Sequence, residues 1–123
     1  MHGFLKKAQD NLGLAKYCFE NGFYDVAANR AYYAAFQAAV AALAVEGIAN
    51  PKPEHKWTQS TFNGELVKRR KIYPNRLSSY LVDMIKVRIK ADYSDELISK
   101  KTASRQLSKA EDFVTIIAKE LQQ

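Results

Sequence analysis

Apolar side chains recur at spacings of three and four residues along most of the chain, as they do on one face of an amphipathic helix. The first helix is expected over residues 4–20, where Asn21 and Gly22 end it because they tolerate the backbone that terminates helices. Asp25 is the expected N-cap of a second helix, which continues to about residue 46. The beginning of the chain therefore predicts two long helices joined by a tight turn.

Three further helices are expected from the same pattern and from the positions of proline and polar capping residues. Their expected ranges are 58–69, 74 or 75 to about 90, and 99 or 102 to 121. Residues 92–99 are expected to form a loop. No segment alternates apolar and polar residues as a strand does, so the predicted fold is all-α. We expect an up-and-down bundle of about five helices in a single domain, residues 1–123.

The second helix is apolar on almost all sides, which predicts that other helices or a second subunit surround it. Its few polar residues are expected to form a structural polar core: Asn29, Arg30, Tyr33 and Gln37. A buried arginine needs an acidic partner, and Asp92 is the candidate for Arg30.

The fourth helix carries an arginine where its apolar stripe predicts a hydrophobic residue. Leu77, Leu81 and Met84 share one face with Arg88. A guanidinium on such a face must be paired or must line a functional cleft. Arg88 is therefore interpreted either as a phosphate-binding group or as half of a buried ion pair.

The charge of the chain is uneven. The net charge is +6, and residues 1–50 carry as many basic as acidic side chains, so the whole excess lies in residues 51–123. The densest basic run is Lys68, Arg69, Arg70 and Lys71, followed by Tyr73. This run is interpreted either as an RNA-backbone contact with Tyr73 stacking on a base, or as an exposed helix terminus.

Cysteine content, hydrophobic runs and histidine spacing argue against a secreted protein, a membrane protein and a metal site. Cys18 is the single cysteine, hydrophobic runs are too short to span a bilayer, and no signal-peptide pattern is seen, so we expect a cytoplasmic protein without membrane association. One cysteine and two distant histidines do not match the spacing of metal ligands, and no glycine-rich phosphate loop is present. No metal and no cofactor are expected.

Two segments resemble the HEPN domain family: residues 29–39, Asn-Arg-Ala-Tyr-Tyr-Ala-Ala-Phe-Gln-Ala-Ala, and residues 88–93, Arg-Ile-Lys-Ala-Asp-Tyr. The resemblance extends over essentially the whole chain. It implies a small helical bundle, commonly a two-fold homodimer, often paired with a minimal nucleotidyltransferase (MNT) in a toxin–antitoxin system. It also implies, for active members, a metal-independent ribonuclease whose signature is an arginine followed four to six residues later by a histidine.

This sequence departs from the ribonuclease signature, because no histidine lies four to six residues after any arginine. Asp92 and Tyr93 occupy the matching positions after Arg88. Histidine serves as acid and base near neutral pH, whereas tyrosine is a poor base and aspartate a poor acid. Tyr93 is the adenylylation target that the resemblance implies, or else a core-packing residue. His55 is a surface loop residue, or else a functional residue that reaches the Arg88 cleft.

The expected function is that of the HEPN component of a HEPN/MNT pair. It would bind a nucleotidyltransferase, a nucleotide or RNA in a basic dimer cleft, through residues chosen from Arg88, Lys90, Tyr93, Lys68, Arg69 and Arg70. One alternative is a divergent metal-independent ribonuclease toxin, for which the catalytic candidates are Arg88, Asp92, Tyr93 and His55. A second alternative is a purely structural helical adaptor, in which Arg88 serves only packing.

Overall fold

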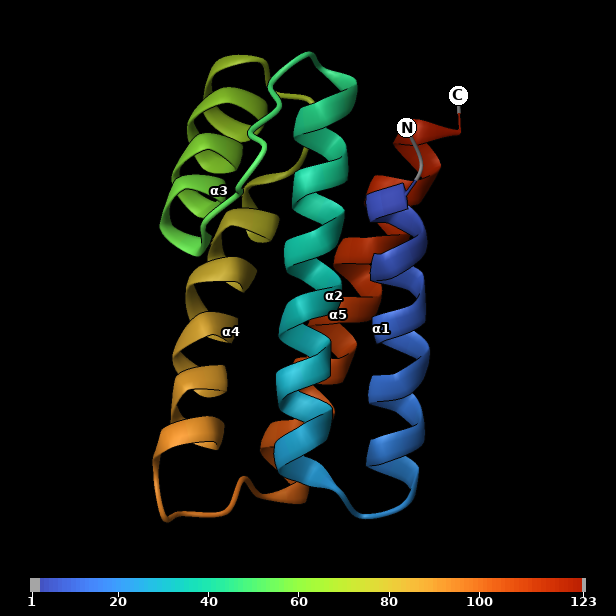
Figure 1. Ribbon diagram of the computed structural model, residues 1–123, viewed down its shortest axis with the longest axis vertical. Helices are drawn as coiled ribbons and strands as arrows, with labels where there is room; N and C mark the ends of the chain where they lie inside the picture. Colours follow the sequence, from blue (N-terminus) through green and yellow to red (C-terminus); the bar gives the residue numbers. More distant parts are fainter. Residues whose placement is uncertain (1–2, 123) are drawn as a thin grey trace.

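The computed structural model describes residues 3–122, and within that range it contains helices joined by turns and loops and no strand (Figure 1). Met1, His2 and Gln123 lie outside the described residues. The elements are α1 (Gly3–Glu20), α2 (Tyr24–Val45), α3 (His55–Thr61), the π-helix η1 (Phe62–Arg69), α4 (Asn75–Tyr93) and α5 (Lys100–Leu121). Since α3 continues directly into η1, the chain forms five helical segments, which confirms the all-α prediction.

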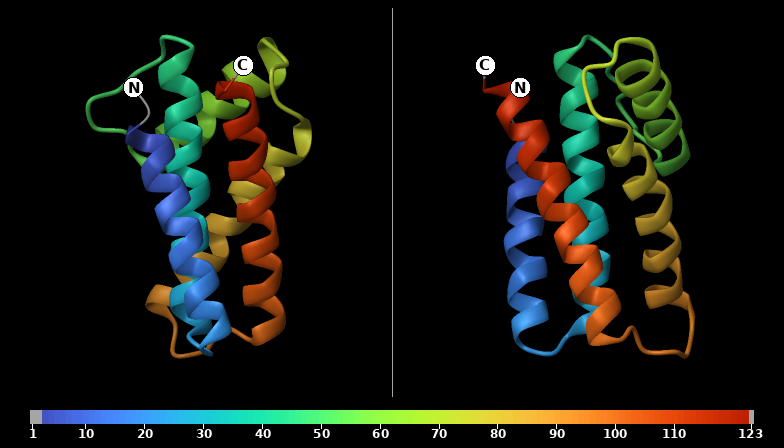
Figure 2. Two further views of the ribbon diagram at one scale, coloured as in Figure 1. Left: turned by 90° about the vertical axis from the view of Figure 1, so that its right-hand side faces the viewer. Right: turned by 180° about the vertical axis from the view of Figure 1, so that it is seen from behind.

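The helices form an up-and-down bundle. In Figure 1, α1 and α4 descend while α2 and α5 ascend, and the short α3–η1 segment lies beside the upper part of α2. In the view from behind in Figure 2, α5 crosses in front of α2, so that α2 is enclosed between α1, α4 and α5. The contacts agree, because α2 touches every other helix of the described chain.

The apolar second helix is the centre of the core, as its composition predicts. Most of its length is buried within one chain, from Ala27 to Leu43. Many of these residues are alanines, which allow neighbouring helices to approach closely. The core around α2 is filled by larger side chains from other elements, including Phe62, Leu77, Phe113 and Ile117.

Glycines and one serine define several helix ends. Gly22 and Gly47 follow α1 and α2 with φ angles of 82° and 80°, the left-handed conformation that favours glycine. At α5, Ser99 is the N-cap, and its hydroxyl accepts a hydrogen bond from the Thr102 amide at 3.1 Å. The prediction that Asp25 caps α2 is wrong. Asp25 lies inside the helix, and its carboxylate accepts the Ile98 amide at 2.7 Å.

Two helix boundaries differ from those expected. The third segment begins at His55 rather than near Thr58, and its second half is a π-helix, in which each turn is wider than in an α-helix. The fourth helix continues to Tyr93, so Asp92 is helical and not part of the predicted loop. Both differences matter for the site, because they fix the directions of the His55 and Asp92 side chains.

The apolar character of α2 is not that of a membrane segment. Among residues 3–122, no helix has both the length and the hydropathy needed to cross a bilayer.

Candidate functional site

Arg88 projects from α4 toward α2 in a largely buried position, with 16% of its side chain exposed. Its Nη2 donates to the Tyr33 hydroxyl at 3.0 Å, and the guanidinium lies 5.4 Å from the centre of the Tyr33 ring. Its Nε is 3.1 Å from Asp92 Oδ2, but the N–H is not aligned with that oxygen, so this contact is an ion pair rather than a hydrogen bond. Among the described residues, the guanidinium therefore makes one hydrogen bond, and its other N–H donors have no hydrogen-bond partner.

A polar network connects this arginine to α1 and α2. The Asn29 amide donates to both oxygens of Asp92, at 3.1 and 3.0 Å. Arg30 donates to the side-chain oxygen of Asn29 (Oδ1) at 2.8 Å and to the side-chain oxygen of Asn11 (Oδ1) at 3.2 Å. The prediction that Arg30 pairs with Asp92 is wrong, because Asn29 stands between them and Asp92 pairs with Arg88. Asp92 consequently accepts from one side chain and neutralises another.

The predicted structural polar core of α2 is half-buried rather than fully buried. Arg30 lies 4.9 Å from the centre of the Tyr33 ring, so Tyr33 is contacted by two guanidiniums, those of Arg30 and Arg88. The side-chain oxygen of Gln37 (Oε1) is buried and has no hydrogen-bond partner among the described residues. Three of the four predicted members, Asn29, Arg30 and Tyr33, therefore belong to the Arg88 cluster, and Gln37 lies further along α2.

His55 joins the same cluster from the start of α3. Its ring centre lies 5.8 Å from that of Tyr33, and its Nδ1 is 2.6 Å from the Tyr32 hydroxyl. It also packs against the Phe36 ring, with centres 4.7 Å apart. His55 therefore lies beside the Arg88 site, and its functional role stays a prediction. We call this group of side chains the Arg88 cluster: Asn11, Asn29, Arg30, Tyr32, Tyr33, His55, Arg88 and Asp92.

The buried Tyr32 hydroxyl determines how His55 presents its ring. No other hydrogen bond of that hydroxyl is found among the described residues, so it is satisfied by donating to His55 Nδ1. This arrangement places the imidazole proton on Nε2, which makes the outer nitrogen a donor. Burial, and secondarily the Arg88 charge, lower the pKa of His55, so the ring is neutral near pH 7. Burial raises the pKa of Tyr32 well above its usual value, which keeps its proton in place.

The lowered pKa of His55 predicts a pH effect on stability. The unfolded chain takes up a proton near pH 6.5, whereas the folded ring resists it. The stabilisation from neutral His55 is therefore present above about pH 6.5 and is lost as the pH falls toward the lower folded pKa. Urea unfolding between about pH 7.5 and pH 5 should show a steeper loss of stability for the wild type than for His55→Gln. Equal pH slopes for the two proteins would contradict the assignment.

The other predicted binding residues do not all lie at this cluster. Tyr93 is 76% exposed, with its ring 6.0 Å from the Arg88 guanidinium, so the core-packing interpretation of Tyr93 is wrong. Lys90 is exposed and pairs with Glu96 at 2.9 Å. Tyr93 and Lys90 remain at the rim, on the last turn of α4.

The basic run lies at the opposite end of the bundle. In Figure 1 the end of η1 is at the top, whereas the last turns of α4 are at the bottom. Arg69 pairs with Glu65 at 2.6 Å, and Arg70 pairs with Glu46 at 3.4 Å. Lys68, Arg69 and Arg70 therefore do not share a single-chain cleft with Arg88, and the exposed-terminus interpretation of the run is supported. Tyr73 is buried against Phe62, with ring centres 5.5 Å apart, so its predicted stacking on an RNA base is wrong.

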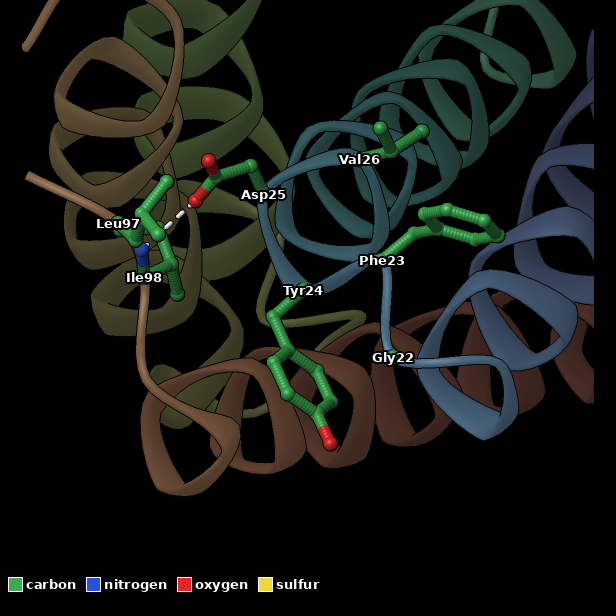
Figure 3. Close-up of a pocket in the computed structure, with 7 residues that line it drawn as sticks. All are labelled: Gly22, Phe23, Tyr24, Asp25, Val26, Leu97 and Ile98. Atoms are coloured by element: carbon green, nitrogen blue, oxygen red, sulfur yellow. Dashed lines mark hydrogen bonds between the residues drawn. The ribbon is translucent and has the colours of Figure 1, made fainter. Parts of the chain in front are cut away.

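Two hollows adjoin at the lower end of the bundle. One, of about 590 Å³, is lined by Leu14 and Val26 together with polar members of the Arg88 cluster and their neighbours. The other, of about 270 Å³, lies between the start of α2 and the loop before α5 (Figure 3). Figure 3 shows Phe23 and Val26 on one side of Asp25 and Leu97 on the other, with the Asp25–Ile98 hydrogen bond between them. Apolar surface therefore borders the Arg88 cluster.

Sequence reasoning overlooked two members of the cluster, Asn11 and Tyr32. Asn11 had no visible signal, because it is one polar residue on an otherwise amphipathic helix. Tyr32 did have one, since a hydroxyl within an otherwise apolar helix requires a buried hydrogen-bond partner. Within residues 3–122, no three histidine, cysteine or carboxylate side chains come together as a metal site would require.

Comparison with known proteins agrees with the all-α fold. The HEPN domain matches residues 1–121 of this chain. A protein of Methanocaldococcus jannaschii named "Putative toxin MJ0605" is 32% identical over 126 aligned residues, which cover 100% of this chain and 90% of the relative. Both matches span the segments that hold Arg88, His55 and the second helix. The chain therefore belongs to the HEPN domain family.

Proposed function

We propose that this HEPN protein is the toxin-like component of a toxin–antitoxin pair, and that its Arg88 cluster binds a phosphate group of RNA or of a nucleotide. The observation that carries the proposal is the placement of Arg88 beside Tyr33 and His55, with donors left unused. The toxin-like role is supported by the identity to the Methanocaldococcus jannaschii protein over the full length of this chain.

The proposed phosphate contact uses three donors of the cluster. Arg88 supplies a guanidinium, which suits phosphate because its donors lie in a planar fork. The Tyr33 hydroxyl accepts from Arg88 and is therefore free to donate its own proton. His55 supplies its Nε2 proton while Tyr32 holds the other ring nitrogen. Asp92 lowers the cost of keeping Arg88 charged in a largely buried position.

The proposal includes a homodimer whose interface contains the apolar surface beside the cluster. Exposed apolar side chains gather there: Leu14, Val26, Phe23, Tyr93 and Leu97. A second copy is the occupant that the HEPN resemblance implies, and it would bring two Arg88 clusters into one cleft. Val26→Glu should convert the dimer to a monomer in analytical ultracentrifugation, while Gln9→Glu, an exposed position of α1, should not. A monomeric wild type would reject this part.

The proposed partner is a minimal nucleotidyltransferase. The proposal predicts a minimal nucleotidyltransferase gene beside this one in the native host, and co-expression of the two proteins should yield a complex that stays together through gel filtration. Mass spectrometry of the complexed chain should show an added adenylyl group on Tyr93, whose ring is accessible. Separate elution of the two proteins, with unmodified Tyr93, would reject the pairing.

A second candidate is the divergent metal-independent ribonuclease. The observation that favours it is that His55 lies near Arg88 in the folded chain, although no histidine follows Arg88 at the signature spacing in the sequence. In the tautomer described above, the outer His55 nitrogen is a donor and not a base, so the geometry favours binding over cleavage. Catalysis would require the opposite tautomer, in which the Tyr32 hydroxyl loses its acceptor.

A further inference from the structure

The ion pair between Arg88 and Asp92 is incomplete, although the two side chains lie one turn apart on α4. Arg88 Nε is 3.1 Å from Asp92 Oδ2, yet it is buried and has no hydrogen-bond partner among the described residues. A buried N–H without a partner is costly, so a turn of the carboxylate toward this donor would be favourable. Contacts from outside α4 must therefore hold the carboxylate out of line.

Asn29, on α2, occupies the edge of the Asp92 carboxylate that an arginine would use. Its Nδ2 lies 3.1 Å from Asp92 Oδ1 and 3.0 Å from Oδ2, so it faces the two oxygens almost symmetrically. A guanidinium that forms two parallel hydrogen bonds with a carboxylate needs both oxygens on that same edge. With Asn29 there, Arg88 approaches one oxygen only, and its N–H is not directed at it.

Arg30 fixes the orientation of the Asn29 amide. Arg30 Nε and Nη2 both donate to Asn29 Oδ1, at 2.8 and 2.5 Å. A guanidinium can only donate and an ionised carboxylate can only accept, so the Asn29 oxygen faces Arg30 and its nitrogen faces Asp92. Arg30 is itself held by Asn11 on α1, at 3.2 Å, and by the Tyr33 ring. The amide therefore cannot turn without losing contacts on both sides.

We propose that Asn29 is a positioning residue, which withholds the Asp92 carboxylate from Arg88 and so leaves the guanidinium fork available to a phosphate. Asp92 and a phosphate compete for the same donors, because both are anions that accept from a planar fork. Asn29 lets Asp92 neutralise Arg88 at short range without bonding to its donors. The effect on ligand binding rests on the proposed function, whereas the geometry of the pair can be measured without a ligand.

Proton–nitrogen NMR of the arginine Nε–H groups tests the positioning in the absence of ligand. Arg88→Lys protein assigns the Arg88 signal, because the substitution removes that group. In Asn29→Ala protein the carboxylate is released, so the Arg88 Nε proton should shift downfield as it forms a charge-assisted hydrogen bond to Asp92. Asn29→Ala/Asp92→Asn protein should lack this shift. An Arg88 signal that is the same in the wild type and in Asn29→Ala protein would overturn the proposal.

Binding of a fluorescein-labelled single-stranded RNA decamer, measured by anisotropy, tests the consequence for the ligand. Asn29→Ala should weaken binding about tenfold, the effect of one competing charge-assisted hydrogen bond. In Asp92→Asn protein the same change should alter binding less than about twofold, because the competing carboxylate is gone. Gln9→Ala, an exposed position of α1, should change nothing. An equal loss in both backgrounds would show that Asn29 contacts the ligand itself and would reject the positioning role.

A second substitution and a second readout separate this inference from misfolding and from the proposed function. Asn29 is half-buried, and Asn29→Leu keeps the volume of the side chain without its amide, so thermal melting should show both variants folded. Asn29→Leu should give the same NMR shift and the same loss of binding as Asn29→Ala. Wild-type protein that binds no RNA would reject the proposed function, and the NMR comparison would then decide the positioning by itself.

Discussion

Replacing Arg88 by alanine is expected to weaken binding of RNA or of a nucleotide about 10- to 100-fold, which corresponds to one or two charge-assisted hydrogen bonds. The reason is that the Arg88 guanidinium combines an ion pair with Asp92 and a hydrogen bond to the Tyr33 hydroxyl, so its charge and orientation are fixed within the cluster. Arg88→Lys should lose most of the same affinity, since an ammonium keeps the charge without the planar fork.

The cost of this substitution to stability should be smaller than for a fully buried ion pair. The side chains of Arg88 and Asp92 are 16% and 27% exposed, so water screens their attraction. We expect the free energy of unfolding to fall by about 1–2 kcal/mol, which leaves the variant folded at 25 °C. Urea unfolding measures this value, and isothermal titration with a single-stranded RNA measures binding to the same samples.

The matched control is Arg105→Ala, an exposed arginine on α5, which should keep both its stability and its affinity. Unchanged binding by folded Arg88→Ala protein would reject the phosphate site. Loss of binding only in parallel with unfolding would instead support the structural-adaptor alternative.

Incubation of the same samples with RNA in the presence of a metal chelator tests the ribonuclease candidate. Cleavage that persists equally in Arg88→Ala and His55→Gln proteins would assign that activity to a contaminant.

Phe113→Ala is expected to lower the free energy of unfolding by about 3–5 kcal/mol, the largest single effect on stability among the variants considered. Phe113 lies on α5 with no solvent exposure, and its ring centre is 5.3 Å from that of Phe62 on the π-helix. Phe62 in turn packs against Tyr73, so the lost ring would leave a cavity where α5 holds the π-helix in place. Thermal and urea unfolding both report the change.

Thr115→Ala provides the comparison on the same helix. Thr115 is exposed, two residues from Phe113, so its substitution should alter stability by less than about 0.5 kcal/mol. A small effect of Phe113→Ala, similar to that of Thr115→Ala, would mean that the π-helix is not anchored by this aromatic contact.

The helices themselves could be predicted well from residue pattern. The apolar composition of α2 identified it as the central helix, and Ser99 and Gly22 marked helix ends that the structure contains. These predictions succeeded because burial and capping depend on side chains within a few positions of one another. The boundary at His55 and the extension of α4 to Tyr93 were missed, because there tertiary packing outweighs local preference.

The π-helix had no sequence signal that could separate it from an α-helix. Gly64 suggested only a weak helix in this region. The wider turns are stable because Phe62, Leu66 and Val67 are buried against the rest of the bundle. The favourable burial of these side chains offsets the poorer backbone geometry, and no pattern within residues 62–69 reveals it.

The sequence by itself determined the helical fold, the central position of α2 and the identification of Arg88 as a charge on an apolar face. Only the tertiary structure decided which side chains meet that charge. In the folded chain His55 lies beside Tyr33 and Arg88, and Asp92 forms an ion pair with Arg88 rather than with Arg30. The basic run lies at the other end of the bundle. The physical reason is that helical periodicity fixes which face a residue occupies. The packing of one helix against another fixes which distant residues come within hydrogen-bonding range.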